Sequence, residues 1–181
     1  MSTLRNLTLG LVFAVALSGL AQAEDTAIDA FYGTYVGKAL VGKDGVSSER
    51  DLNVVIKPFR KGFTVEWTTV TRRAGGKTKR ASYKINFRPS RREGIFGSAM
   101  KINKFGKGVP LDPLKGDPYV WARISGKTLT VHAMIILDDG GFEMQTYDRT
   151  LTDSGLSLDF ERIRDGQPLR RIKASLERQG E

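Results

Sequence analysis

The sequence predicts an all-β fold, an antiparallel up-and-down meander of about ten strands that forms a closed barrel or a strongly curled sheet. Apolar and polar residues alternate with period two along many short segments. Turns rich in Gly, Asp, Asn and Pro separate these segments at roughly even spacing. No segment has a strong helical period, apart from one short turn expected at 24–30. These features are typical of consecutive hairpins.

Each strand is expected between two such turns. The expected strands are 31–41, 49–57, 63–72, 78–88, 95–102, 119–124, 128–137, 142–152, 156–164 and 169–178. The segments that separate them are KDG, PFRKG, AGGK, PSRREG, a long loop at 103–118, SGK, DDGG, TDSG and RDGQP. In a meander successive turns alternate between two ends, so the long loop and the AGGK hairpin are expected at the same end.

Most of these strands have one apolar face. Leu52, Val54 and Ile56 alternate with polar neighbours, and Leu156, Leu158 and Phe160 do the same. Closing such a sheet into a barrel removes its exposed edges and encloses the apolar face. The interior either packs as a core or lines a ligand cavity. The residues expected to line a cavity are Trp67, Tyr83, Phe87, Val131, Phe142 and Met144.

The first residues are typical of a cleaved signal peptide. Arg5 gives a positive start, 7–20 form an apolar run, and Ala21-Gln22-Ala23 is a small-x-small cleavage site. The apolar run is shorter than the span of about 20 residues that a membrane helix needs. We therefore expect cleavage after Ala23, a single barrel domain over 24–181, and a periplasmic or secreted protein.

Composition excludes some chemistry and indicates a polarised charge. The chain has no cysteine, which excludes disulfides and thiolate metal sites. Residues 57–107 hold 15 Lys and Arg but two acidic residues, whereas the rest of the mature chain is mildly acidic. This layout indicates either an anionic partner or a surface that keeps the protein soluble.

A basic cluster is expected beside the long loop, where it would bind phosphate or carboxylate groups. Its members are Arg72, Arg73, Lys77, Lys79 and Arg80 on the hairpin, with Lys104 and Lys107 from the loop. The expected partner is an anionic lipid or the surface of an anionic membrane. Nucleic acid is not expected, because the chain is predicted to be exported and has no aromatic stacking motif.

The loop 103–118 is longer than most connections in a compact domain, which indicates a function or disorder. Leu111 and Leu114 lie between prolines and are expected either to form a lid over the barrel mouth or to plug it. Both alternatives place the loop across one end of the barrel.

No catalytic, metal or cofactor motif is recognisable. His132 is the one histidine, and a lone histidine on a strand is usually structural. Gly106-Lys107-Gly108 lacks the helix that a phosphate-binding loop requires. Asp138 and Asp139 do not have the spacing of a calcium loop. The densely charged strand faces and the polar C-terminus also disfavour an outer-membrane barrel.

A short match to a known family lies at the start of the first strand. The sequence FYGTY at 31–35 resembles the G-x-W opening of lipocalin-like (calycin) barrels, with Tyr35 where that family has tryptophan. Arg170 and Arg171 are similar in position to the arginine that packs across that aromatic residue. Ten strands resemble the fatty-acid-binding branch more closely than the eight-stranded one. The resemblance implies a barrel that holds a small apolar ligand.

The sequence therefore predicts an exported, non-catalytic protein that binds an apolar or amphiphilic, anionic small molecule or lipid. The alternative is a filled barrel that acts as an envelope interaction module through its basic surface. A cavity would favour the first function, and a packed interior would favour the second.

Overall fold

The computed structural model describes residues 25–43, 46–72, 76–98, 101–102, 108–109 and 111–180. Within them, ten strands form one closed barrel in the order β1-β12-β11-β10-β9-β8-β5-β4-β3-β2. These strands are β1 (Gly33–Lys43), β2 (Val46–Phe59), β3 (Gly62–Arg72), β4 (Thr78–Pro89), β5 (Ile95–Ser98), β8 (Tyr119–Ser125), β9 (Thr128–Ile136), β10 (Phe142–Leu151), β11 (Gly155–Arg164) and β12 (Gln167–Arg178). The predicted all-β meander is confirmed, and of its two expected forms it takes the closed barrel.

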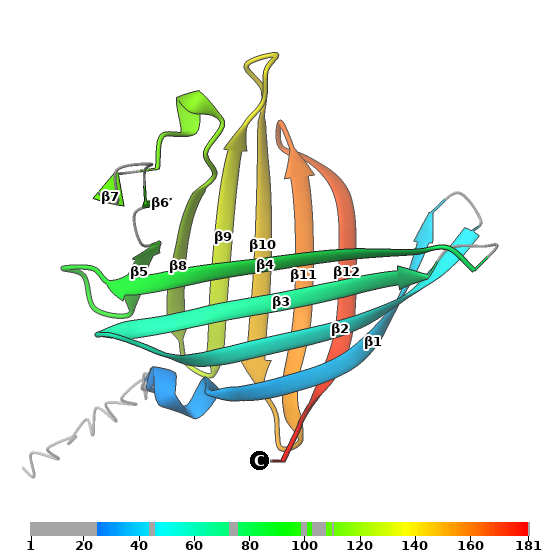
Figure 1. Cartoon of the computed structure of the whole chain (residues 1–181), viewed down its shortest axis with the longest axis horizontal. Coiled ribbons are helices and arrows are strands. Elements are labelled where there is room, and N and C mark those ends of the chain that lie inside the picture. Colours follow the sequence, from blue (N-terminus) through cyan, green and yellow to red (C-terminus); the bar gives the residue numbers. More distant parts are fainter. Residues whose placement is uncertain are drawn as a thin grey trace, which may run out of the picture.

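The barrel is flattened into two layers whose strands cross. β1–β4 run across the front of the view and β8–β12 pass behind them at a steep angle (Figure 1). All neighbouring strands pair antiparallel. β5 is short, and β4 pairs with it only at Phe87, Arg88 and Pro89 in the described chain. At the end of the segment expected as one strand at 95–102, β6 (Lys101–Ile102) pairs instead with β7 (Gly108–Val109) in a separate ribbon.

One end of the barrel, here called the sealed end, is closed by the segment before β1. A 3₁₀ helix, η1 (Ile28–Phe31), buries Phe31 completely in the core. The Tyr35 hydroxyl donates a hydrogen bond of 2.9 Å to the Phe31 carbonyl. The Arg178 guanidinium lies 5.3 Å from the centre of the Tyr35 ring and donates to the Tyr35 oxygen and to the Ala30 carbonyl.

This arrangement corrects one detail of the expected resemblance. The arginine that packs across Tyr35 is Arg178, whereas Arg170 lines the interior and Arg171 pairs with Asp159 on the outer surface. Strand length explains the difference, because β12 runs to Arg178 and its last residues pair with the start of β1. The closed ten-stranded antiparallel barrel is compatible with a calycin-like architecture.

The apolar core fills the half of the barrel next to the sealed end. It includes Phe31, Tyr35, Ile56, Phe63, Val65, Phe87, Ala122, Leu129, Val131, Leu156 and Leu176. Phe63 stacks on Phe87 with ring centres 5.0 Å apart and meets Phe96 edge-on at the same distance. Dense packing at this end supplies the main hydrophobic stabilisation.

The expected signal peptide at 1–23 lies outside the described residues. Among the residues that are described, no helix combines the length and the apolar character that crossing a bilayer would require.

Candidate functional site

The opposite end of the barrel, here called the mouth, leads into a cavity of about 580 Å³. The strand ends at the mouth are those joined by the β1–β2, β3–β4, β9–β10 and β11–β12 connections. Both apolar and cationic residues line the cavity, among them Leu52, Val54, Trp67, Tyr83, Tyr147, Leu158, Phe160, Arg50, Lys79, Arg149, Arg162 and Arg170. A volume of this size is within the range of small-molecule sites.

Four aromatic rings form a layer between the core and the cavity. Trp67 stacks on Tyr83 of the neighbouring strand with ring centres 5.2 Å apart. It also reaches across the barrel to Tyr147, at 5.4 Å, and Tyr147 lies 4.7 Å from Phe160. Tyr83 is 57% exposed although Trp67 beside it is partly buried, because β5 covers only the far end of β4. A ligand in the cavity would rest on this layer.

Arg149 lies against the aromatic layer and is the largest fully buried side chain, with 1% of its surface exposed. Its guanidinium carbon is 5.3 Å from the centre of the Tyr147 ring and 5.6 Å from that of Trp67. Its Nε and Nη1 atoms are buried and have no hydrogen-bond partner within the described chain. Burial lowers the pKa of Arg149 to about 10, so the side chain is still cationic at neutral pH.

The two aromatic rings compensate this charge only in part. A desolvated cation–π contact contributes about 2 kcal/mol, whereas burying an unpaired guanidinium costs several kcal/mol. The unpaired N–H groups add a further penalty of about 1–3 kcal/mol. The charge of Asp148 favours the cationic form, but burial outweighs it, and Arg149 forms no ion pair within the described chain.

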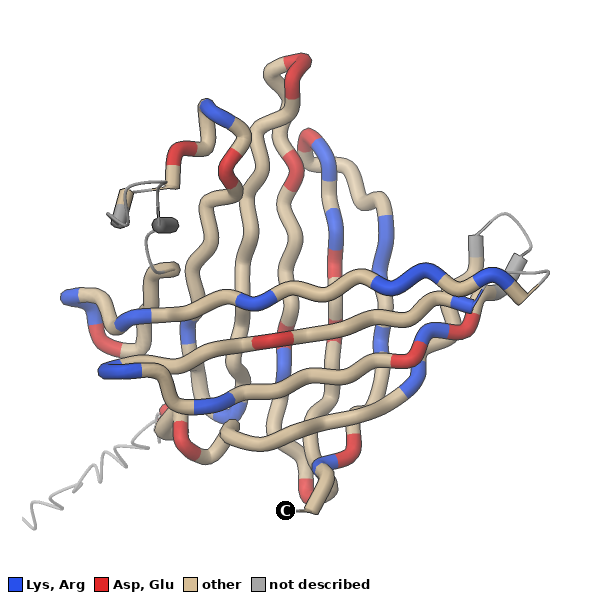
Figure 2. The backbone as a smooth tube through the Cα atoms, viewed as in Figure 1, with Lys and Arg blue, Asp and Glu red and all other residues tan. Residues whose placement is uncertain are grey.

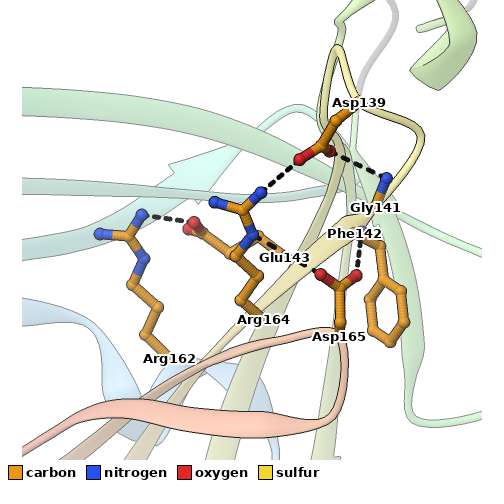
Figure 3. Close-up of polar contacts among 7 residues, drawn as sticks. All are labelled: Asp139, Gly141, Phe142, Glu143, Arg162, Arg164 and Asp165. Carbon is orange, nitrogen blue, oxygen red and sulfur yellow. Dashed lines mark hydrogen bonds and ion pairs between the residues drawn. The ribbon is translucent and has the colours of Figure 1, made fainter.

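A hydrogen-bonded chain follows β10 from Tyr147 toward the mouth. The Tyr147 hydroxyl donates to Gln145 Oε1 at 2.8 Å, and Gln145 Nε2 donates to Glu143 Oε1 at 2.6 Å. Glu143 also accepts a hydrogen bond from Arg162, while Arg164 beside it pairs with Asp139 and Asp165 (Figure 3). Burial raises the pKa of Tyr147 to about 12, which keeps its hydroxyl protonated as a donor. Burial would raise the pKa of Glu143, but Arg162 and Gln145 hold it below its usual value.

Two further arginines, Arg50 and Arg170, line the cavity on β2 and β12. Burial is the main cause that lowers the pKa of Arg50, and the positive charge of Arg170 lowers it further. The two cations are therefore close enough to repel each other. No acidic residue belongs to the described lining, so the interior is cationic as well as aromatic.

The structure separates the six residues expected to line a cavity into three groups. Trp67 and Tyr83 do line it. Phe87 and Val131 are buried in the core near the sealed end. Phe142 and Met144 do not line it, which corrects the prediction for β10. The inner face of β10 is instead Gln145, Tyr147 and Arg149, and Phe142 is 40% exposed.

The expected basic cluster is also divided. Arg72 forms an ion pair of 2.6 Å with Asp51, and Lys77 is exposed. Lys79 lines the cavity while Arg80, the next residue along β4, borders a groove on the outer surface. Arg73, Lys104 and Lys107 lie outside the described residues. Basic positions follow both β4 and β12 (Figure 2), so positive charge is present on two sides of the mouth.

The described end of the long loop does not enter the barrel. Asp112 caps a second 3₁₀ helix, η2 (Pro113–Lys115), by accepting a hydrogen bond from the Leu114 amide. Leu114 is 84% exposed, and neither Leu111 nor Leu114 lines the cavity, so the two leucines do not plug it. η2 lies near β9, on the opposite side of Figure 1 from the β3–β4 hairpin.

Sequence reasoning missed the four arginines of the cavity, namely Arg50, Arg149, Arg162 and Arg170. A signal for Arg149 was present, because Tyr147, Arg149 and Leu151 alternate along β10 with the period of an inward face. The apolar residues Phe142 and Met144 pointed to the other face. The feature that identifies the site is therefore a charged side chain, Arg149, buried on the inner face of a strand whose apolar residues suggested the opposite face.

His132 lies outside the cavity, where it stacks on Trp121 with ring centres 4.8 Å apart. In the part of the chain that the structure describes, no three His, Asp or Glu residues are grouped to hold a metal ion. No protein-family model matches the chain, and no match was found among curated proteins.

Proposed function

We propose that this protein binds an anionic amphiphile inside the barrel, without catalysis. The acid group would pair with Arg149, and the apolar part would lie against Trp67, Tyr83 and Phe160. The observation that carries the proposal is the fully buried Arg149 guanidinium at the floor of a cavity, where Nε and Nη1 have no hydrogen-bond partner among the described residues. A ligand carboxylate or phosphate would supply the missing acceptor.

The presence of a cavity supports binding over a filled barrel that acts through its surface. The proposal keeps the export expected from residues 1–23, so the ligand would be met in the periplasm or outside the cell. A lipid or lipid-derived acid fits the aromatic floor and the cationic lining, and the mouth would be the route of entry.

Native mass spectrometry with lipid extraction, on protein purified from its own periplasm, identifies the ligand directly. We expect a bound acid in the native mass. The Arg149→Gln variant should bind a long-chain carboxylate at least about tenfold more weakly, because a hydrogen bond to a charged group contributes about 1.5–3 kcal/mol. Arg123→Gln is the matched control, because Arg123 is an exposed arginine on β8.

A second measurement separates binding from misfolding. Arg149→Met should be more stable than the wild type without ligand, by about 1–3 kcal/mol, because it removes an uncompensated buried charge. A variant that loses affinity while gaining stability supports the proposal. A wild-type protein that purifies without ligand and binds no long-chain anion in titration would refute it.

A further inference from the structure

A second group of cations lies along the cavity wall toward the mouth. Arg50, Arg162 and Arg170 all line the cavity, and Arg162 is directly opposite Arg170 in the β11–β12 register. Arg50 lines the same cavity from β2, and the positive charge of Arg170 adds to burial in lowering its pKa. These three residues are here called the mouth cluster.

The mouth cluster holds three positive charges, and one carboxylate, that of Glu143, pairs with it in the described chain. Glu143 pairs with Arg162, and neither Arg50 nor Arg170 forms an ion pair within the described chain. The Nε atoms of Arg50 and Arg162 are buried and have no hydrogen-bond partner there. Like charges held close together in a partly desolvated site are unfavourable unless an anion neutralises them.

The mouth cluster is separate from Arg149 along the barrel. Arg149 is opposite Leu158 in the β10–β11 register, and Arg162 comes four residues later on β11, facing the same cavity. Four residues of strand separate the two backbone levels by about 13 Å. The aromatic residues Tyr147 and Phe160 lie between the two levels. A single carboxylate is too small to satisfy both cationic centres.

We infer that the ligand is an elongated dianion, with one acid group on Arg149 and a second on the mouth cluster of Arg50, Arg162 and Arg170. This inference rests on the proposed function and specifies its ligand class, an apolar body with an acid at each end. The acid at the mouth is a carboxylate or a phosphate, since arginine forks bind either.

The test compares α,ω-dicarboxylic acids with monocarboxylic acids of equal carbon number. Chains of about eight to sixteen carbons bracket the separation of about 13 Å. Calorimetric titration of the wild-type protein at neutral pH should give affinities at least about tenfold higher for the diacid. The bis-phosphate of the corresponding diol is the second probe, and it distinguishes a preference for phosphate from one for carboxylate at the mouth.

Variants then locate the preference. Arg170→Gln and Arg50→Gln should bring diacid affinity down toward the level of the monoacid and weaken monoacid binding much less than diacid binding. Arg149→Gln should weaken both. Arg171→Gln is the control, because Arg171 is the next residue on β12 and pairs with Asp159 on the outer surface.

The possible results separate the two proposals. Equal wild-type affinities for monoacid and diacid, both reduced by Arg149→Gln, would overturn the dianion and leave the proposed function in place. A diacid preference that persists in both mouth-cluster variants would also overturn it. If the wild type binds neither acid nor the bis-phosphate, the proposed function fails and the dianion fails with it.

Discussion

At the scale of single residues, Arg149 determines what this barrel is suited to hold. Its neighbours on the same inner face are Tyr147 and Leu151, so the chain places a permanent cation where an apolar residue would pack more favourably. Two aromatic rings and the charge of Asp148 offset part of the cost, but no carboxylate in the described chain forms an ion pair with Arg149. Such sites commonly exchange stability for function.

Glu143 gives the site a measurable dependence on pH. Its folded-state pKa is below the ordinary value of 4.5, so the ionised form stabilises the fold. This contribution is complete above pH 4.5 and is lost as the pH falls through the folded-state pKa. Glu143→Gln should therefore lower stability by about 1 kcal/mol at neutral pH, a small value because Arg162 is 39% exposed to screening water.

Thermal unfolding of both proteins across the acid range checks this prediction. The difference in Tm between the wild type and Glu143→Gln should close as the pH drops below 4.5. Glu161→Gln, which removes an exposed carboxylate from β11, is the control and should show no such convergence. A difference that stays constant into the acid range would mean that the Glu143–Arg162 pair does not stabilise the fold.

At the scale of strands, the sequence predicted nearly all of the barrel wall because alternation and turn chemistry are local signals. The ten expected segments correspond to the ten strands of the wall, with shifts of a few residues at their ends. The short β5 was the main difference, since the expected strand continued to residue 102. Whether a segment pairs with the wall or with β7 depends on contacts distant in sequence.

The inner face of β10 shows why the site was harder to predict than the wall. Along β10 one face carries Phe142 and Met144, and the other carries Glu143 and Arg149. Apolar content favours the first face as the inner one. The structure chooses the second because Tyr147 and Leu151 pack inward and the charged residues must then follow them. Because successive residues of a strand alternate between the two faces, the orientation of one residue sets that of all the others. The hydrophobicity of a few residues therefore does not decide which face of β10 is the inner one.

Closure of the barrel at the β1–β12 seam depends on Gly37. The described register of this seam contains only three residue pairs, and Gly37 is opposite Leu176 in one of them. A Cβ on Gly37 would lie 2.2 Å from the Ser175 carbonyl oxygen and 2.7 Å from Leu176 Cδ2. Gly37→Ala should therefore destabilise the protein by about 1–3 kcal/mol, as overpacking does in other cores. Urea unfolding measures this change.

Gly42→Ala in the same strand is the matched control, because no described atom beyond its chain neighbours lies within 4 Å of the added Cβ. It should change stability by less than about 0.5 kcal/mol. Equal effects of the two substitutions would show that loss of glycine in β1, rather than the contact with Ser175, determines the stability.

At the scale of the whole molecule, the barrel is divided between a packed end and a receiving end. η1, Arg178 and the aromatic core close the sealed end, and the cavity occupies the half toward the mouth. Basic residues lie at the mouth on β4 and β12 (Figure 2). A cationic opening in front of a cationic interior attracts anions from a distance and then retains them.

Charges at the opening are expected to affect the association rate, whereas charges in the interior are expected to affect the dissociation rate. Reversing the exposed charges Lys77 and Arg80 should slow association of a long-chain carboxylate by about two- to tenfold at low salt and leave dissociation unchanged, because rim charges steer encounters. The effect should shrink toward physiological ionic strength, where the screening length is about 8 Å. Stopped-flow fluorescence of Trp67, in a Trp121→Phe background, follows both steps. Lys127→Glu, in the turn between β8 and β9 at the sealed end, should leave association unchanged. If it slows association equally, net charge drives the encounter and the polarity of the barrel does not.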